Sequence, residues 1–138
     1  MKWTLEVVTV PVSDVDRAKA FYAEQVGFHV DFDSDFGAGR FVQLTPPGSG
    51  CSIVIGSALT EMTPGSLEGV QLVVGDVVAA RAELAGRGVD VSEVQVYGPD
   101  GLRPREGDED LDNVGFCSFA DPDGNRWAVQ QITSRGVS

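Results

Sequence analysis

The hydrophobic pattern of this chain occurs twice. Alternating apolar positions run up to Val10 and again up to Leu72, and each run leads into a stretch with helical spacing. The apolar residues of these stretches recur on one helical face: Val15, Ala18, Tyr22 and Val26 in the first, and Val77, Ala80 and Leu84 in the second. The pattern therefore predicts two copies of one supersecondary unit, produced by a divergent duplication.

Both predicted helices carry signals at their ends. Ser13, with Asp16 three residues later, is typical of a capping box at the first helix, and Asp76 is placed to cap the second. Gly27 and Gly88 follow the helices and favour the left-handed conformation that often ends one. The sequence thus predicts where each helix begins and ends.

Strand-like runs complete each half. A short strand is expected after each helix and a hairpin after that, with turns rich in proline and glycine. The expected strands after the helices are 27–30 and 88–91, and the hairpin strands are 41–44 with 52–55 and 116–119 with 127–130. Each half reads β-α-β-β-β, which predicts an α+β protein with eight strands and two helices. We expect one domain over residues 1–138, with module one at about 1–58 and module two at about 69–133. The two βαβββ modules are expected to form a curved, eight-stranded mixed sheet around a central cavity.

Charge and composition limit the classes of partner that the protein is expected to bind. The chain has 21 acidic and 10 basic residues and a formal charge of −11, which argues against nucleic acid as a partner. No apolar run is long enough to span a membrane and there is no leader-like start, so a cytoplasmic protein is expected. Much acid lies in the loop of about residues 97–115, which is either a lid over the cavity or a disordered insertion. Cys51 and Cys117 match no metal-ligand spacing.

The order of elements and two local motifs resemble the vicinal oxygen chelate (VOC) superfamily, which includes glyoxalase I, extradiol dioxygenases and bleomycin-resistance proteins. The motifs are Val12-Ser13-Asp14-Val15-Asp16-Arg17-Ala18-Lys19-Ala20-Phe21-Tyr22 with Gly27-Phe28, and Asp121-Pro122-Asp123-Gly124-Asn125. The resemblance implies the glyoxalase/bleomycin-resistance fold and a homodimer. It does not specify the reaction, because the superfamily hosts many chemistries.

The resemblance also implies where a metal would be bound. The corresponding ligand positions are Val7, Gly69, Ala128 and, in the fourth strand, Ile53, which an alignment slip would move to Val54 or Ile55. None of these side chains has a nitrogen, oxygen or thiolate donor, and a transition-metal centre requires three or four. His29 is the only histidine and lies away from these positions. We therefore expect no metal and no other cofactor.

Strand alternation predicts which side chains line the cavity. The expected ligand-binding residues are Val7, Thr9, Gln43, Gly69, Gln71, Ala128 and Gln130. This lining is apolar with a few uncharged polar groups, which suits a small organic molecule with carbonyls or hydroxyls. The glutamines are expected either to bond to each other or to the backbone, or to contact the ligand.

Neighbouring residues complete the expected site. The carboxylates Asp31, Asp33 and Asp35 are placed at an outer edge, where none is suited to act as a general base. Arg40 either neutralises an acidic ligand or is simply solvated. Aromatic walls are expected from residues in or beside the sheets, namely Trp3, Phe32, Phe36, Phe41, Phe116 and Tyr97, whereas Trp127 is expected in the core.

Three classes of function remain. The first is metal-independent binding of a hydrophobic small molecule, as in drug or natural-product sequestration. The alternative is a metal-independent isomerase, epimerase or lyase acting on a carbonyl-containing metabolite. A metal-dependent glyoxalase or dioxygenase is disfavoured, no hydrolase triad can be assembled around His29, and no phosphate-binding glycine loop is present. A pure interaction module without a cavity is the last alternative.

Overall fold

The computed structural model describes residues 1–37 and 39–135. The chain forms two compact units, each built around one sheet. Unit 1 comprises Met1–Leu67 and Asp121–Asn125, and unit 2 comprises Glu68–Ala120 and Arg126–Ser138.

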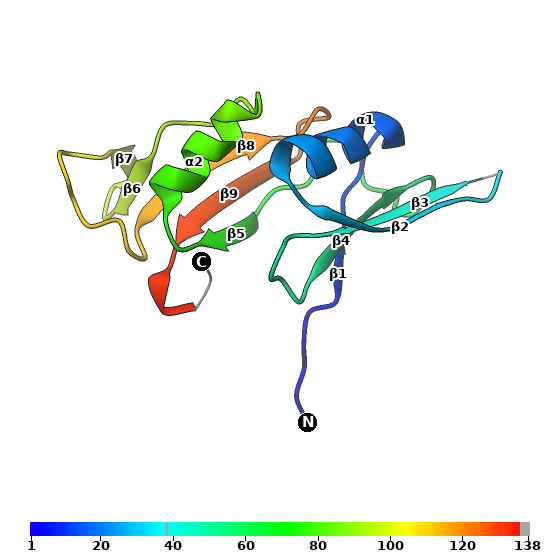
Figure 1. Cartoon of the computed structure of the whole chain (residues 1–138), viewed down its shortest axis with the longest axis horizontal. Coiled ribbons are helices and arrows are strands. Elements are labelled where there is room, and N and C mark those ends of the chain that lie inside the picture. Colours follow the sequence, from blue (N-terminus) through cyan, green and yellow to red (C-terminus); the bar gives the residue numbers. More distant parts are fainter. Residues whose placement is uncertain (38, 136–138) are drawn as a thin grey trace. The chain divides into compact units, whose positions relative to one another are not determined.

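Unit 1 is a four-stranded mixed sheet with one helix (Figure 1). The strands lie in the order β1-β4-β3-β2, and β1 runs parallel to β4 while the other pairs are antiparallel. The elements are β1 (Val7–Thr9), α1 (Val15–Ala20), the π-helix η1 (Phe21–Val26), β2 (His29–Asp35), β3 (Arg40–Thr45) and β4 (Ser52–Gly56).

Unit 2 repeats this plan with one more strand. Its order is β5-β9-β8-β6-β7, with β5 parallel to β9, and α2 packs on β8 and β9 (Figure 1). The elements are β5 (Val70–Val74), α2 (Val77–Gly86), β6 (Gln95–Gly98), β7 (Gly101–Pro104), β8 (Gly115–Ala120), β9 (Arg126–Gln131) and the 3₁₀ turn η2 (Thr133–Arg135).

The α+β class and the βαβββ modules are as predicted, and two details differ. Nine strands in two sheets are found among the described residues, because the segment after β6 turns back at Gly101 (φ +97°) and pairs as β7. The strand expected at 88–91 is absent; only Val91 bridges to Phe119, and the strand that follows α2 begins at Gln95. The alternation of apolar residues at 88–91 looks the same for an isolated bridge as for a strand, so the sequence predicted a strand.

The helix ends follow the predicted signals with one exception. Asp14, rather than Ser13, caps α1 and accepts a hydrogen bond from the Arg17 amide at 3.1 Å. Asp76 caps α2 through the Ala79 amide at 3.0 Å, as expected. Gly27 and Gly88 adopt the predicted left-handed conformation (φ +93° and +86°). Ser13 lies one residue before the cap, and its amide and hydroxyl both donate to the Asp123 carboxylate.

Each sheet buries one alternating set of apolar side chains under its helix. The two sets are Val10, Val42, Leu44, Ile53 and Ile55 in unit 1, and Val96, Cys117, Phe119, Trp127 and Val129 in unit 2. A slip of one residue in either register would move these side chains to the other face, so their burial fixes the register. We call the opposite surface of each sheet its helix-free face.

The Asp121–Asn125 turn is a structural part of unit 1. One Asp121 carboxylate oxygen accepts hydrogen bonds from the amides of Asp123, Gly124 and Asn125 at 2.9–3.0 Å. Its other oxygen accepts from the buried Tyr22 hydroxyl at 2.7 Å and from the side-chain amide nitrogen (Nδ2) of Asn125 at 2.8 Å. Asn125 also bonds to Pro11 and Leu67. The motif therefore stabilises the fold around η1.

Candidate functional site

The register of unit 1 gathers three predicted ligand-binding residues on its helix-free face. Thr9 and Gln43 both pair with Val54, one from each side, so the three side chains form a row across the sheet. Val7 lies two residues before Thr9 and shares this face. Phe32 extends the row on the far side of Gln43 and is 59% exposed.

The register of unit 2 gathers the predicted residues of the second half in the same way. Gln71 pairs with Ala128, and Val73 pairs with Gln130 one step along the strands. Gly69 precedes β5 and has a positive φ of 86°. These residues lie on the face opposite Trp127 and Val129, which are buried. The placement of Trp127 in the core is confirmed by its 3% exposure and its stacking on Phe119.

The register also corrects the fourth position at which a metal would be bound. Ile53 pairs with Val8 and Leu44 and belongs to the buried set under α1. Val54 lies on the helix-free face and holds the place in its sheet that Ala128 holds in the other, since Thr9↔Val54 matches Gln71↔Ala128. Valine offers no metal donor either. Over the described residues, no group of three or more His, Cys, Asp or Glu side chains is placed to hold a metal ion. The four corresponding positions, Val7, Val54, Gly69 and Ala128, therefore carry no side-chain donor for a transition metal.

Gln130 and Gln43 each donate a hydrogen bond from the side-chain amide nitrogen. Gln130 donates from Nε2 to the Asn113 carbonyl oxygen at 2.8 Å, and Gln43 donates from Nε2 to Ser52 Oγ at 3.4 Å. Backbone bonding, one of the two alternatives expected for Gln130, is therefore present. Gln71 is exposed, and none of the described residues bonds to its side chain.

A carboxylate that the sequence placed at the outer edge lies on the helix-free face of unit 1. Asp31 alternates with His29, which pairs with Thr45, so both lie on this side. The register shift between Val30 and Phe32 then adds Phe32 to the same face and turns Asp33 to the helix side. Asp31 Oδ2 accepts a short hydrogen bond from Thr45 Oγ1, and Thr45 Oγ1 lies 2.6 Å from Ser52 Oγ. The sequence grouped Asp31 with Asp33 and Asp35 at the outer edge, and β2 is the edge strand of its sheet. The bulge separates them, because Asp33 bonds to Lys19 and Arg40 on the helix side. A β-bulge in mid-strand has no dependable sequence signal.

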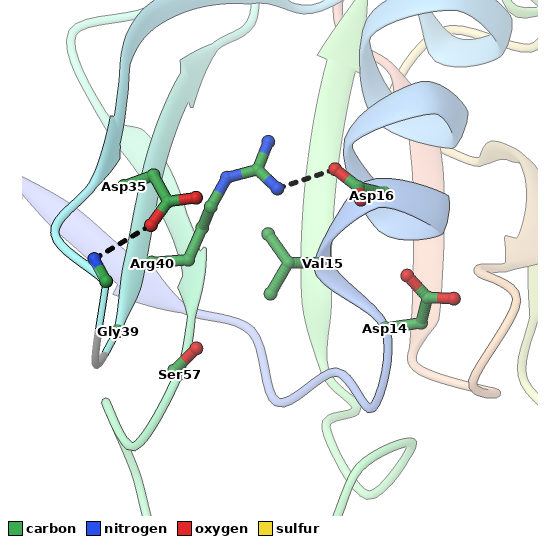
Figure 2. Close-up of a pocket in the computed structure, with 8 residues that line it drawn as sticks. Asp14, Val15, Asp16, Asp35, Gly39, Arg40 and Ser57 are labelled. Carbon is green, nitrogen blue, oxygen red and sulfur yellow. Dashed lines mark hydrogen bonds and ion pairs between the residues drawn. The ribbon is translucent and has the colours of Figure 1, made fainter.

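Arg40 is ion-paired within unit 1 and is therefore not free for an acidic ligand. Its guanidinium makes two 2.9 Å hydrogen bonds to Asp33. It makes another of 2.6 Å to Asp16 at the start of α1, which Figure 2 shows. These contacts hold the pKa of the Asp33 carboxyl well below its usual range and raise the pKa of Arg40. A pocket of about 300 Å³ beside them is rimmed by Asp14, Asp16 and Asp35. Through these ion pairs, Arg40 connects the β2–β3 hairpin to α1.

The acidic segment 97–115 is an ordered part of unit 2. It begins as the β6–β7 hairpin and continues into a loop in which Arg103 forms a two-pronged ion pair with Glu109, both bonds 2.7 Å. The Arg103 guanidinium lowers the pKa of the Glu109 carboxyl to about 2. Leu111 is buried, and the Asn113 amide donates to the Gln131 carbonyl at 2.8 Å. The loop therefore packs against the end of β9.

These features define a two-module α+β protein whose modules each present a helix-free sheet face with uncharged polar groups. The family model of the Glyoxalase/Bleomycin resistance protein/Dioxygenase superfamily matches residues 4–129. The chain belongs to this superfamily.

Several solved structures are similar over nearly the whole chain. TnmS3, an antibiotic binding protein from Streptomyces sp. CB03234, is 35% identical, with 95% of this chain and 97% of that one covered and a TM-score of 0.74. A glyoxalase/bleomycin resistance protein from the same organism is 36% identical, with coverage of 93% and 100% and a TM-score of 0.71. A superfamily member from Sphaerobacter thermophilus DSM 20745 is 28% identical, with coverage of 94% and 98% and a TM-score of 0.72.

No curated protein matches the chain. Across the described part of the chain, the helices are all too short or too polar to cross a membrane.

Proposed function

We propose that this protein binds a small, largely apolar organic molecule and sequesters it without a metal ion. The observation that carries the proposal is the set of side chains at the family's metal positions: Val7, Val54, Gly69 and Ala128 provide no donor. Similarity to an antibiotic binding protein over 95% of the chain supports an antibiotic or related natural product as the ligand.

Each helix-free face is proposed as a contact surface in its own right. Apolar side chains supply most of the contact area, and uncharged polar groups orient the molecule through hydrogen bonds: Thr9 and Gln43 in unit 1, and Gln71 and Gln130 in unit 2. We propose a homodimer as the working assembly, as the family resemblance implies.

Native mass spectrometry of the protein as purified, without added metal, tests the proposal. We expect a metal-free dimer that retains an organic molecule or takes up an added antibiotic. An Ala128→Arg variant, which places a long charged side chain on the helix-free face, is expected to lose this binding. Val78→Arg is the control, because Val78 is 45% exposed on α2. A stoichiometric transition metal would contradict the proposal.

Asp31 supports a second candidate, a metal-independent isomerase or lyase. Its carboxylate is on the helix-free face, where it would remove a proton from the carbon beside a substrate carbonyl. Incubation with a panel of α-hydroxy ketones in D₂O tests this: deuterium incorporation that is lost in Asp31→Asn would favour the enzyme, and none would leave binding as the function.

A further inference from the structure

The helix-free face of unit 1 carries a directed chain of hydrogen bonds that ends on Asp31. Asp31 is a carboxylate and only accepts, so the hydrogen of Thr45 Oγ1 is committed to it. Ser52 Oγ lies 2.6 Å from Thr45 Oγ1 and must therefore donate to it. With that hydrogen used, Ser52 only accepts from Gln43, whose Nε2 lies 3.4 Å away. The order of donation is Gln43 to Ser52 to Thr45 to Asp31.

This order fixes which groups are left for a ligand. The Gln43 amide donates from its nitrogen, so its Oε1 faces away from Ser52, and none of the described residues donates to it. The second Asp31 oxygen is 3.9 Å from His29 Nε2, too far for a hydrogen bond, so it also remains an acceptor. Both available polar atoms are acceptors, and one carries negative charge.

Apolar surface surrounds these acceptors. Phe32 and Val54 flank Gln43 in the row across β2, β3 and β4; Phe32 is exposed, whereas Val54 is buried at 6% exposure. The exposed Val7 pairs with Ser52, the second member of the chain of hydrogen bonds. An aromatic or aliphatic body can lie on Phe32 and Val7 while a polar hydrogen reaches the acceptors. Ser52 is 7% exposed, which protects the chain from competing water.

We propose that Asp31 and Gln43 form a donor-selective subsite, which recognises ligands bearing an ammonium, amine N–H or hydroxyl on an apolar framework. Ligands whose polar groups are only carbonyls or ethers leave both acceptors unsatisfied, and this desolvation disfavours them. The inference rests on the proposed small-molecule binding and narrows the expected ligand, since carbonyls alone no longer suit this face.

Three probes of similar size test the subsite: benzylamine, benzyl alcohol and acetophenone. Each is titrated into ¹⁵N-labelled protein while the backbone amides of β2 and β3 and the Gln43 side-chain amide are followed by NMR. We expect benzylamine to bind about tenfold more tightly than acetophenone, with benzyl alcohol between them. Asp31→Asn should reduce the advantage of benzylamine to about threefold or less.

Asp33→Asn is the matched control, because it removes the same charge two residues along the strand, from the side that bonds to Lys19 and Arg40. It should leave the probe preference unchanged. Thr45→Val, which removes the hydroxyl but keeps the shape, supplies a second test if Asp31→Asn folds poorly, and should weaken the preference for benzylamine.

Equal affinity for the three probes on β2 and β3, or equal loss in Asp31→Asn and Asp33→Asn, would overturn the donor-selective subsite while leaving small-molecule binding intact. Absence of any shift on β2 and β3 would overturn it as well. Retention of an organic molecule in the native mass spectrum remains the separate measurement of the proposed function.

Discussion

Unit 1 and unit 2 contain corresponding hairpins, β3–β4 and β8–β9, whose turns differ in burial and in hydrogen bonding. The turn between β3 and β4, residues 46–51, is held by local bonds such as that of the Cys51 amide to Ser49, and Gly48 is exposed. The turn between β8 and β9 contains Asp121 and Asn125, which are 5% and 0% exposed. The two hairpins correspond in their strands, whereas the turn at Asp121–Asn125 contains buried polar side chains and the turn at 46–51 is exposed or half-buried.

The Asp121–Asn125 motif, on which the resemblance to the superfamily partly rests, makes its contacts within the fold of unit 1. Its side chains satisfy backbone amides and the Tyr22 hydroxyl, so its polar residues stabilise unit 1 and are not available to a ligand. A motif of this kind reports the fold, and function must be argued from the helix-free faces.

Replacing Asp121 should have the largest effect on stability. Asp121→Ala removes the acceptor for five hydrogen bonds and leaves buried donors unsatisfied, so we expect a loss of about 3 kcal/mol in the free energy of unfolding, measured in urea. Ser49→Ala in the other turn is the control and should cost less than about 0.5 kcal/mol. Similar losses in the two variants would remove the distinction between the turns.

The two cysteines offer a chemical comparison of the units. Cys117 is 1% exposed on the helix-covered face of unit 2, and burial raises the pKa of its thiol to about 11. Because only the thiolate is alkylated, a rise from 9.0 to about 11 lowers its reactive fraction about a hundredfold. We expect iodoacetamide at pH 8 to label Cys51 and spare Cys117 in the folded protein, with both labelled in urea. Mass spectrometry of peptides measures this, and rapid labelling of Cys117 under native conditions would be inconsistent with its burial.

The glutamines of the helix-free faces are expected to contribute unequally to stability. Gln130→Leu removes the donor to the Asn113 carbonyl, and we expect a loss of about 1 kcal/mol in urea unfolding. Gln71→Leu is the control, since Gln71 is exposed and bonds to none of the described residues, and its effect should stay within about 0.5 kcal/mol. An equal effect of both changes would mean that the Gln130 bond does not stabilise the loop.

The sequence predicted most of the fold because the buried sets are regular. Val10 and Val129 are buried, as their predicted helix-side positions require, and Asp76 begins α2 while Gly27 follows the end of η1 by local chemistry. Prediction failed where the structure departs from regular alternation or depends on distant partners. The bulge at Asp31 and the pairing of Ser13 with Asp123 belong to these classes, and neither leaves a local pattern in the chain.

The smallest predicted effect concerns the loop that only unit 2 possesses. Glu109 has a folded pKa of about 2, lowered from 4.5 first by the Arg103 hydrogen bonds and then by the Glu106 amide. A carboxyl with a depressed folded pKa stabilises the structure above its unfolded pKa and loses that contribution as pH falls toward the folded value. Between pH 4.5 and about 2, the protection of the Glu106 and Glu109 amides, which is the intrinsic exchange rate at the same pH relative to their observed rate, should therefore fall, while amides of the exposed turn at 46–51 in unit 1 should show no such loss. Glu109→Gln, studied by hydrogen exchange at pH 6, should reproduce this loss of protection without acid. If the variant exchanges like the parent, the Arg103–Glu109 pair does not order the loop, and its stability must come from Leu111 and the backbone bond between Asn113 and Gln131.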